Sequence, residues 1–199
     1  MAYASGDLIE ATHYNGFVAS VNALWGTGTG DRGYGQSSTL STVSATNTVT
    51  ATQWANLIAR IDSMRQHQSG TTSGLTQPTT GDTIAYLSTL STQIGTIDTN
   101  RLSNSVAESS LVSANATGTW GGTSNAVREC AFTFSSANAM RYFFNAGGTI
   151  TFNTISSSFT GNTKSNNWDS VANSGSATVT NSNFWNNLST SNYTLATFT

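Results

Sequence analysis

Glycines at positions 28, 30 and 33 have the spacing of a dinucleotide-binding loop. In that loop the glycines follow a β-strand directly and a helix begins right after them, so that backbone N–H groups at the helix start bind the phosphates. Here the sequence predicts a helix before the glycines and a Ser/Thr-rich loop after them. We therefore interpret residues 28–33 as a turn-rich loop and predict no nucleotide cofactor.

Side chains that could bind a metal ion are few. The chain has two histidines, His13 and His67, and one cysteine, Cys130. This set is too small for a Cys/His zinc site, and nothing near Asp31 resembles an EF-hand loop. We expect His13 at the surface, His67 at a helix C-terminus where a positive charge is favourable, and Cys130 as a small buried residue without an intrachain disulfide.

Acid–base and nucleophilic chemistry have equally weak support. The nine acidic residues are scattered, and the second half of the chain contains only Glu108, Glu129 and Asp169. Glycoside cleavage needs two carboxyl groups that flank a groove, and a serine hydrolase would carry a nucleophile-elbow motif, which is absent from this sequence. We therefore predict no catalytic residue, no metal site, no cofactor and no enzymatic activity.

Aromatic side chains are the most suggestive functional residues of the second half. Exposed aromatics among Asn and Thr could bind sugars or a partner protein, but the interpretation that we favour is the core of a small β-rich domain. Arg141 is expected to stack on an aromatic ring or to pair with an acid. The aromatic residues concerned are Tyr142, Phe143, Phe144, Trp168, Phe184, Trp185 and Tyr193.

The elements that would position these groups begin with a repeat. Residues 9–18 (IEATHYNGFV) return as residues 49–58 (VTATQWANLI) at an offset of 40 residues. Helical spacing predicts helices over about 11–25 and 51–66, and Thr50 with Gln53 has capping-box spacing. The two apolar stripes would pack together or against other subunits; they comprise Tyr14, Phe17, Val18, Val21 and Leu24, and Trp54, Leu57, Ile58, Ile61 and Met64.

A third helix is expected over about 82–101. Its apolar residues are spaced by three or four positions, close to a heptad seam. Two interpretations remain open at this stage, a short parallel coiled coil between chains and a core helix of an ordinary bundle. The residues of this seam are Ile84, Leu87, Leu90, Ile94 and Ile97.

After about residue 103 the helical spacing gives way to alternation. Residues 131–134 and 149–152 are predicted strands, and residues 177–180 and 193–198 are weaker candidates. Short helices are expected near residues 137–144 and 168–172. The expected fold class is α+β: an N-terminal helical repeat module of two or three helices, residues 1–102, that anchors and oligomerises, followed by a small β-rich domain, residues 103–199.

Composition narrows the class of protein. Charged residues make up 8% of the 199 residues, and the net charge is −2, whereas ordinary soluble domains have roughly 25% charged residues. There is no basic run to bind nucleic acid and no apolar stretch of membrane-spanning length or signal-peptide pattern. A chain with so few charges favours a subunit that hides much of its surface in an assembly, or alternatively a secreted β-rich domain.

Two stretches resemble a known class of protein. Residues 6–28, with the second copy at 48–64, resemble the N-terminal helical units of virion structural proteins in tailed phages, particularly cyanophages. Residues 139–150, with the string Arg-Tyr-Phe-Phe-Asn-Ala-Gly-Gly, together with 167–168 and 184–191, look like a domain that recurs in phage structural and tail-associated proteins. This resemblance implies a non-enzymatic virion part, made in the host cytoplasm and located in the tail, neck or fibre region.

The expected function is therefore assembly. We expect a homo-oligomer, with a trimer favoured by analogy with fibre-like phage parts, that docks to other virion proteins. The alternative is a receptor-binding or carbohydrate-binding adhesin of a tail fibre that contacts a host surface glycan. Neither interpretation includes nucleic-acid binding or membrane insertion.

Overall fold

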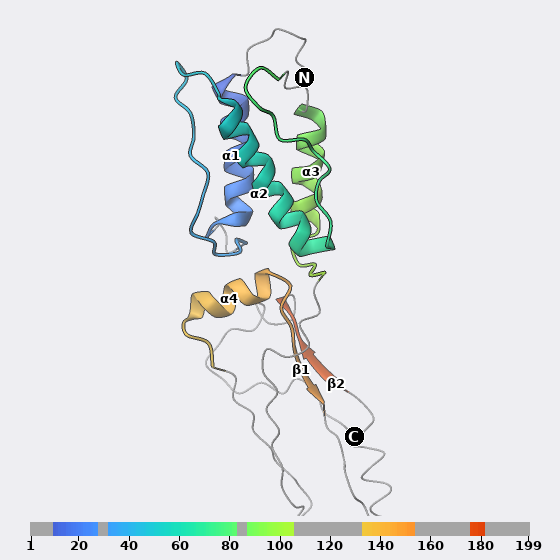
Figure 1. The fold of residues 1–199 in the computed structure, drawn as a ribbon. Helices are drawn as coiled ribbons and strands as arrows, with labels where there is room; N and C mark the ends of the chain where they lie inside the picture. Colours follow the sequence, from blue (N-terminus) through green and yellow to red (C-terminus); the bar gives the residue numbers. More distant parts are fainter. Residues whose placement is uncertain (1–9, 28–31, 83–86, 106–132, 154–175, 182–199) are drawn as a thin grey trace, which may run out of the picture.

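A computed structural model describes residues 10–27, 32–82, 87–105, 133–153 and 176–181 (Figure 1). The elements are α1 (Ala11–Trp25), α2 (Ala51–Ser69), α3 (Leu87–Thr99), α4 (Ala137–Asn145), β1 (Ile150–Asn153) and β2 (Ser176–Val179). The described part of the chain is therefore mostly helical with one small sheet. The expected bounds of α1 are confirmed, α2 runs three residues further than expected, and α3 is described from Leu87.

The start and end of α2 follow from its sequence. The Thr50 side chain accepts the Gln53 N–H at 3.2 Å, and the Gln53 side chain accepts the Thr50 N–H at 2.8 Å, which confirms the capping box. The helix ends at Ser69, and the next residue, Gly70, caps it with a φ of 71°, the left-handed conformation that glycine adopts at little cost. An N-cap of this kind stabilises a helix by about 1 kcal/mol.

Helices α1, α2 and α3 form a bundle in which all three run in the same direction (Figure 1). At the N-terminal end, the rings of Tyr14 and Trp54 lie 6.2 Å apart, and each is the fourth residue of its helix. At the C-terminal end, Gln68 of α2 donates to the Ile97 carbonyl of α3 at 2.9 Å. A parallel order needs connections that span the full helix length, so the loops between the helices are extended return segments.

The first return segment, here called the first arm (residues 32–50), is attached to α1 by two asparagines seven positions apart. Asn15 accepts the Val43 N–H and donates to the Val43 carbonyl, both at 2.8 Å. Asn22 makes the same pair of bonds with Leu40, also at 2.8 Å each. Two turns of helix and three extended residues both span about 10 Å, which lets both side chains pair with the arm.

The second return segment, or second arm (residues 70–82), is attached to α2 in a similar way. Asp62 accepts the Ser73 N–H at 2.7 Å. Leu75 packs against the core, and Pro78 is buried. The repeating unit of this part of the chain is therefore a helix followed by an arm that returns along it.

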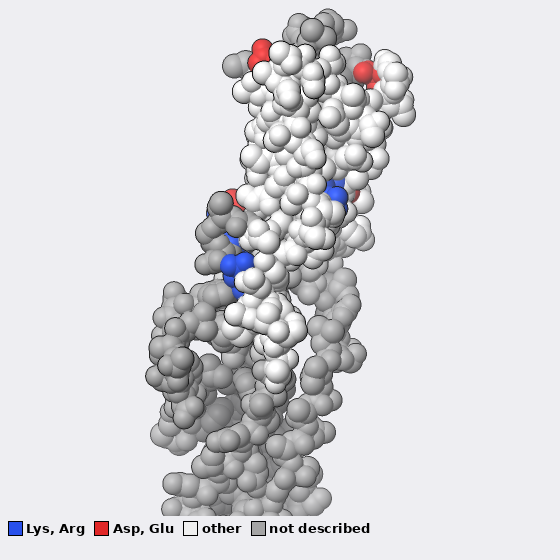
Figure 2. All heavy atoms as spheres, turned by 90° about the vertical axis from the view of Figure 1, so that its left-hand side faces the viewer, with Lys and Arg blue, Asp and Glu red and all other residues white. Residues whose placement is uncertain are grey.

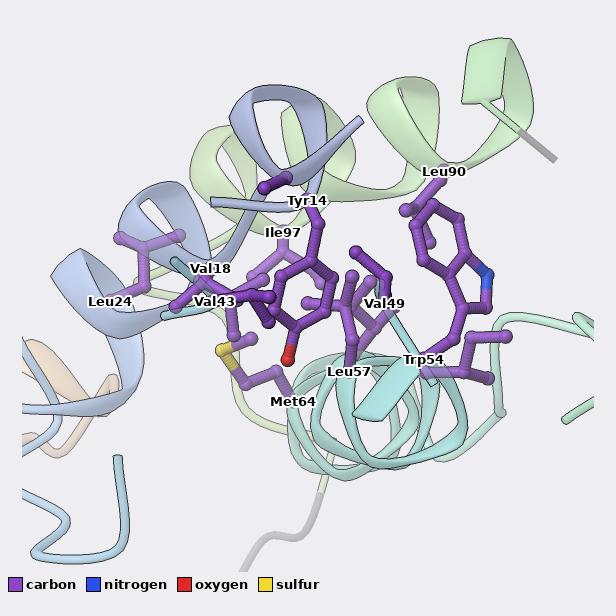
Figure 3. Close-up of a cluster of buried hydrophobic side chains, with 14 of the residues drawn as sticks. Tyr14, Val18, Leu24, Val43, Val49, Trp54, Leu57, Met64, Leu90 and Ile97 are labelled. Carbon is purple, nitrogen blue, oxygen red and sulfur yellow. The ribbon is translucent and has the colours of Figure 1, made fainter. Parts of the chain in front are cut away.

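The core lies between the three helices and under the two arms (Figure 3). Helical spacing places the apolar stripes of α1 and α2 face to face, and Val43 and Val49 of the first arm join them. Complete burial of one such aliphatic side chain is worth roughly 1.5–3 kcal/mol. The sequence left open whether the stripes pack on each other or on other subunits, and within this chain they pack on each other.

Helix α4 and the sheet lie beyond the C-terminal end of the bundle (Figure 1). The Ser136 side chain caps α4 by accepting the Ala139 N–H at 3.0 Å. Strands β1 and β2 pair antiparallel, with Ile150 opposite Val179, which places two predicted strands correctly to within a residue.

Only part of the expected β-rich domain, residues 103–199, lies among the described residues. Thr133 and Phe134 have irregular structure, so the predicted strand 131–134 is wrong at those two residues; residues 131 and 132 lie outside the described residues. The predicted strand 193–198, the predicted helix 168–172 and Cys130 also lie outside them. The described residues of the second half thus contain one helix and one two-stranded sheet.

Candidate interaction site

Most residues expected at an assembly interface lie in the chain's own core. The expected interface residues that are at most 5% exposed are Tyr14, Val18, Val21, Leu24, Trp54, Leu57, Ile58, Ile61, Met64, Leu90 and Ile97. Phe17 and Ile94 are partly buried against this core. Ile84 and the side chain of Leu87 lie outside the described part.

This burial accounts for the stripes without a second molecule. A side chain that is covered by its own chain presents no surface to a partner in this conformation. Leu90 and Ile97 place α3 as a core helix of the bundle, the second of the two interpretations that the heptad spacing left open. An additional role of these residues in oligomerisation stays a prediction.

A surface hollow lies between α1 and α3. Its volume is about 280 Å³, and its lining includes the apolar side chains of Phe17 and Ile94 beside the small residues Gly16, Ser20 and Ser91. Small-molecule sites usually enclose about 300–1,000 Å³ and contain convergent polar groups. The α1–α3 groove is smaller and shallow, and it suits a polypeptide segment better than a substrate.

The second notable site is the junction between the bundle and α4, centred on Asn145. This side chain is 1% exposed. It donates to the Gly33 carbonyl at 2.9 Å and accepts from the Asn181 side-chain amide at 3.0 Å. One buried amide therefore joins the first arm, the end of α4 and the residues that follow β2.

His67 completes the junction from the end of α2. Its Nε2 lies 2.9 Å from the Ala146 carbonyl, and a carbonyl can only accept, so Nε2 carries a proton in this contact. The ring also meets the Tyr34 ring edge-on, with centroids 5.5 Å apart. The expected position of His67 at a helix C-terminus is confirmed, and its contact with the residue after α4 is an additional finding.

Tyr34 is hydrogen-bonded to residues at the C-terminal ends of all three bundle helices. Its N–H donates to the Leu24 carbonyl at 2.7 Å, and its hydroxyl donates to the Arg101 carbonyl at 2.7 Å and accepts from Gln68 at 2.8 Å. Burial raises the pKa of the Tyr34 hydroxyl, although the hydrogen bond from Gln68 opposes that shift. The neutral phenol is thus a structural part of this end of the bundle.

Charged side chains follow the common direction of the helices. Glu10 and Asp82 lie at the N-terminal end, while Arg32 and Arg101 lie near the C-terminal end, where Arg32 pairs with Asp98. Figure 2 shows red atoms at the top of the bundle, blue atoms with some red beside them lower down, and an uncharged surface between the two regions. Parallel helix dipoles add at both ends, so Glu10 and Asp82 at the N-terminal end and the arginines at the C-terminal end are favourably placed. Asp98, in the last turn of α3, is not, and it pairs with Arg32.

The remaining sequence-based expectations have mixed outcomes. His13 is half-buried rather than fully exposed, with its Nδ1 3.8 Å from Glu10. Arg141 stacks over the ring of Tyr142 at 4.9 Å, as expected. The rings of Phe143 and Phe144 lie 5.2 Å apart, and Phe144 is fully buried.

Other expected features lie largely outside the described residues. They include Trp168, Phe184, Trp185 and Tyr193, and most of the glycine loop 28–33. Helix α1 does precede that loop, as predicted.

Sequence reasoning missed the polar residues that hold the fold together. Asn15, Asn22, Tyr34 and Asn145 were not singled out, because asparagine and tyrosine are common in this chain and carry no motif. The spacing of Asn15 and Asn22 on one face of a helix was the available signal.

Comparisons with known proteins yield no relative: no family model, curated protein or solved structure matches this chain. Among the described residues, no three or more His, Cys, Asp or Glu side chains are grouped as a metal ion would require. In the same part of the chain, every helix is too short or too polar to cross a membrane.

Proposed function

We propose that this chain is a non-enzymatic structural subunit of a tailed-phage virion, associated with the tail, neck or fibre. It acts by oligomeric assembly and by docking to other virion proteins. The observation that carries the proposal is the junction at Asn145, where a buried amide joins the bundle to the second part of the chain. Such a junction suits a part that holds two binding regions at a fixed distance.

The surface of the bundle also supports an assembled role. Its side face consists largely of uncharged residues (Figure 2). Hydroxyl and amide side chains can be buried against a neighbour at moderate cost when they are hydrogen-bonded, whereas unpaired charges cannot.

Oligomerisation is proposed to use the second part of the chain. We place a β-rich domain at residues 103–199 and assign trimer contacts to it, because the apolar stripes of the bundle are already covered. Among the described residues, β1 and β2 form a two-stranded sheet, and a sheet of two strands is marginally stable alone. Strand addition from a neighbouring copy would complete such a sheet.

The test is a dilution series of the full chain by sedimentation velocity and light scattering. A trimer that persists on dilution supports the proposal, and a monomer at all concentrations contradicts its oligomeric part. The phage part is tested by labelling the protein in infected cells and imaging purified particles. Label on the tail or neck supports the proposal, whereas a protein that never enters particles contradicts it.

The adhesin alternative receives no support from the described aromatics. Tyr142, Phe143 and Phe144 are engaged in internal packing. Binding of the full chain to a glycan array or to host cells would revive it.

A further inference from the structure

The bundle has three grooves between neighbouring helices but only two described arms. The first arm leads from the end of α1 to the start of α2, and its Val43 packs among residues of both helices (Figure 3). The second arm leads from the end of α2 to the start of α3 (Figure 1). Neither described arm contributes a residue to the lining of the α1–α3 groove, which includes Phe17 and Ile94.

The two arms share one sequence pattern. Residues 40–49 read LSTVSATNTV, and residues 75–84 read LTQPTTGDTI, an offset of 35 residues. Leu40 and Leu75, at the first position, are both partly buried against the core. Val43 and Pro78, at the fourth, are both buried.

The arms also share a turn just before the next helix. The Asn47 N–H donates to the Ser44 carbonyl at 2.9 Å, and the Asp82 N–H donates to the Thr79 carbonyl at 3.1 Å. Sequence and structure therefore agree that the two arms are copies of one unit. In each case this unit precedes a helix.

A third copy of the pattern precedes α1. Residues 1–9 read MAYASGDLI and match positions two to ten of the pattern; the leucine position has no counterpart among them. At the offset of 40 residues, Tyr3 aligns with Val43, Asp7 with Asn47, and Ile9 with the buried Val49. This copy has an apolar residue at each of these two buried positions and an acid at the turn position, as the second arm does.

We propose that the α1–α3 groove is the docking site of the chain's own residues 1–9, which form a third arm. We assign each described arm to the groove beside the helix that follows it in the chain. The helix that follows residues 1–9 is α1. Thr12 and His13, in the first turn of α1, line this groove. Residues 1–9 are therefore tethered close to it, and tethering gives a high effective concentration. The bundle is then a closed ring of three helices and three arms.

A cross-linking experiment on the full chain tests this docking. In a Cys130→Ser background, Tyr3→Cys is combined with Ser91→Cys, an exposed residue of α3 that lines the groove. The matched control combines Tyr3→Cys with Ser63→Cys, which is also exposed but lies on α2. We expect the Ser91 pair to form an intrachain disulfide at least about 10-fold faster than the control pair under mild oxidation.

Two results would overturn the proposal. Equal rates for the two pairs would mean that residues 1–9 do not prefer the groove. Disulfide-linked dimers in place of intrachain products would mean that the occupant is a second copy. Circular dichroism of the reduced variants verifies that both retain the helical content of the parent chain.

A second measurement avoids cysteines. Hydrogen exchange of the Phe17 and Ile94 backbone amides is compared between the parent chain and the Tyr3→Ser, Ile9→Ser variant. Faster exchange at these positions, with unchanged exchange in the middle of α2, supports docking. Unchanged exchange at both positions contradicts it.

Discussion

Tyr142 of α4 lies directly against the backbone of Gly35 in the first arm. A Cβ atom on residue 35 would overlap the Tyr142 ring, and the φ of Gly35 is +75°. Glycine is therefore required at this position for two separate reasons. The contact brings residues more than 100 positions apart in the sequence to one interface, beside the buried Asn145.

Gly35→Ala should destabilise the chain by the sum of both effects. A left-handed conformation costs an alanine about 1–2 kcal/mol, and the overlap with Tyr142 adds roughly 1–3 kcal/mol. The control is Gly74→Ala, because Gly74 has a φ of +74° and open space around its Cβ position. Urea unfolding measures both, and equal losses for the two variants would show that Tyr142 does not crowd residue 35.

Asn22→Ala should loosen the first arm. It removes both hydrogen bonds to Leu40 and leaves the Leu40 backbone groups, which are partly buried, without these partners. We expect a loss of about 1–3 kcal/mol in the free energy of unfolding. Asn56→Ala, on the exposed face of α2, is the control and should change stability by less than about 0.5 kcal/mol. Similar losses of stability for both variants would show that the hydrogen bonds between Asn22 and Leu40 do not hold the first arm.

Leu57→Asp should prevent folding rather than only assembly. Leu57 is completely buried in the core of its own chain, where truncation to alanine already costs about 2–5 kcal/mol. Thr52→Asp places the same charge on an exposed residue in the first turn of α2 and should fold normally. Circular dichroism and size-exclusion chromatography distinguish the cases. A folded Leu57→Asp monomer would mean that this position serves association instead.

Alkaline pH should unfold the chain through its buried tyrosines. Burial raises the pKa of Tyr34, and of Tyr14, above the ordinary value of 10.0. Both hydroxyls are neutral in either state at lower pH. Above about pH 10 the unfolded chain ionises first, so stability falls as pH rises toward the folded-state pKa.

The measurement is the free energy of unfolding against pH, with tyrosinate absorbance followed in parallel. Tyr34→Phe should be less stable at neutral pH, because the Arg101 carbonyl loses the hydroxyl that donates to it and the Gln68 amide loses one of its two acceptors. Its stability should also fall less steeply above pH 10. A slope as steep as that of the parent chain would exclude Tyr34 as the source of the alkaline sensitivity.

The sequence by itself determined the helices and their buried faces. Apolar residues at helical spacing located α1 and α2, and the Thr50–Gln53 pair marked the start of α2. These signals are local, because capping and periodicity depend on residues within one or two turns. Alternation likewise indicated β1 and β2, although it also suggested a strand at Thr133 and Phe134 that is absent.

Only the tertiary structure decided what the buried faces meet. Helical periodicity predicts that an apolar stripe is buried away from water, but the same stripe can pack on its own chain or on another molecule. The answer depended on the parallel order of the helices, which in turn depends on arms fixed by Asn15 and Asn22 to residues 18 to 28 positions away. Such hydrogen bonds between side chains and distant backbone carry no periodic signal in the sequence, so they emerge only once the chain is folded.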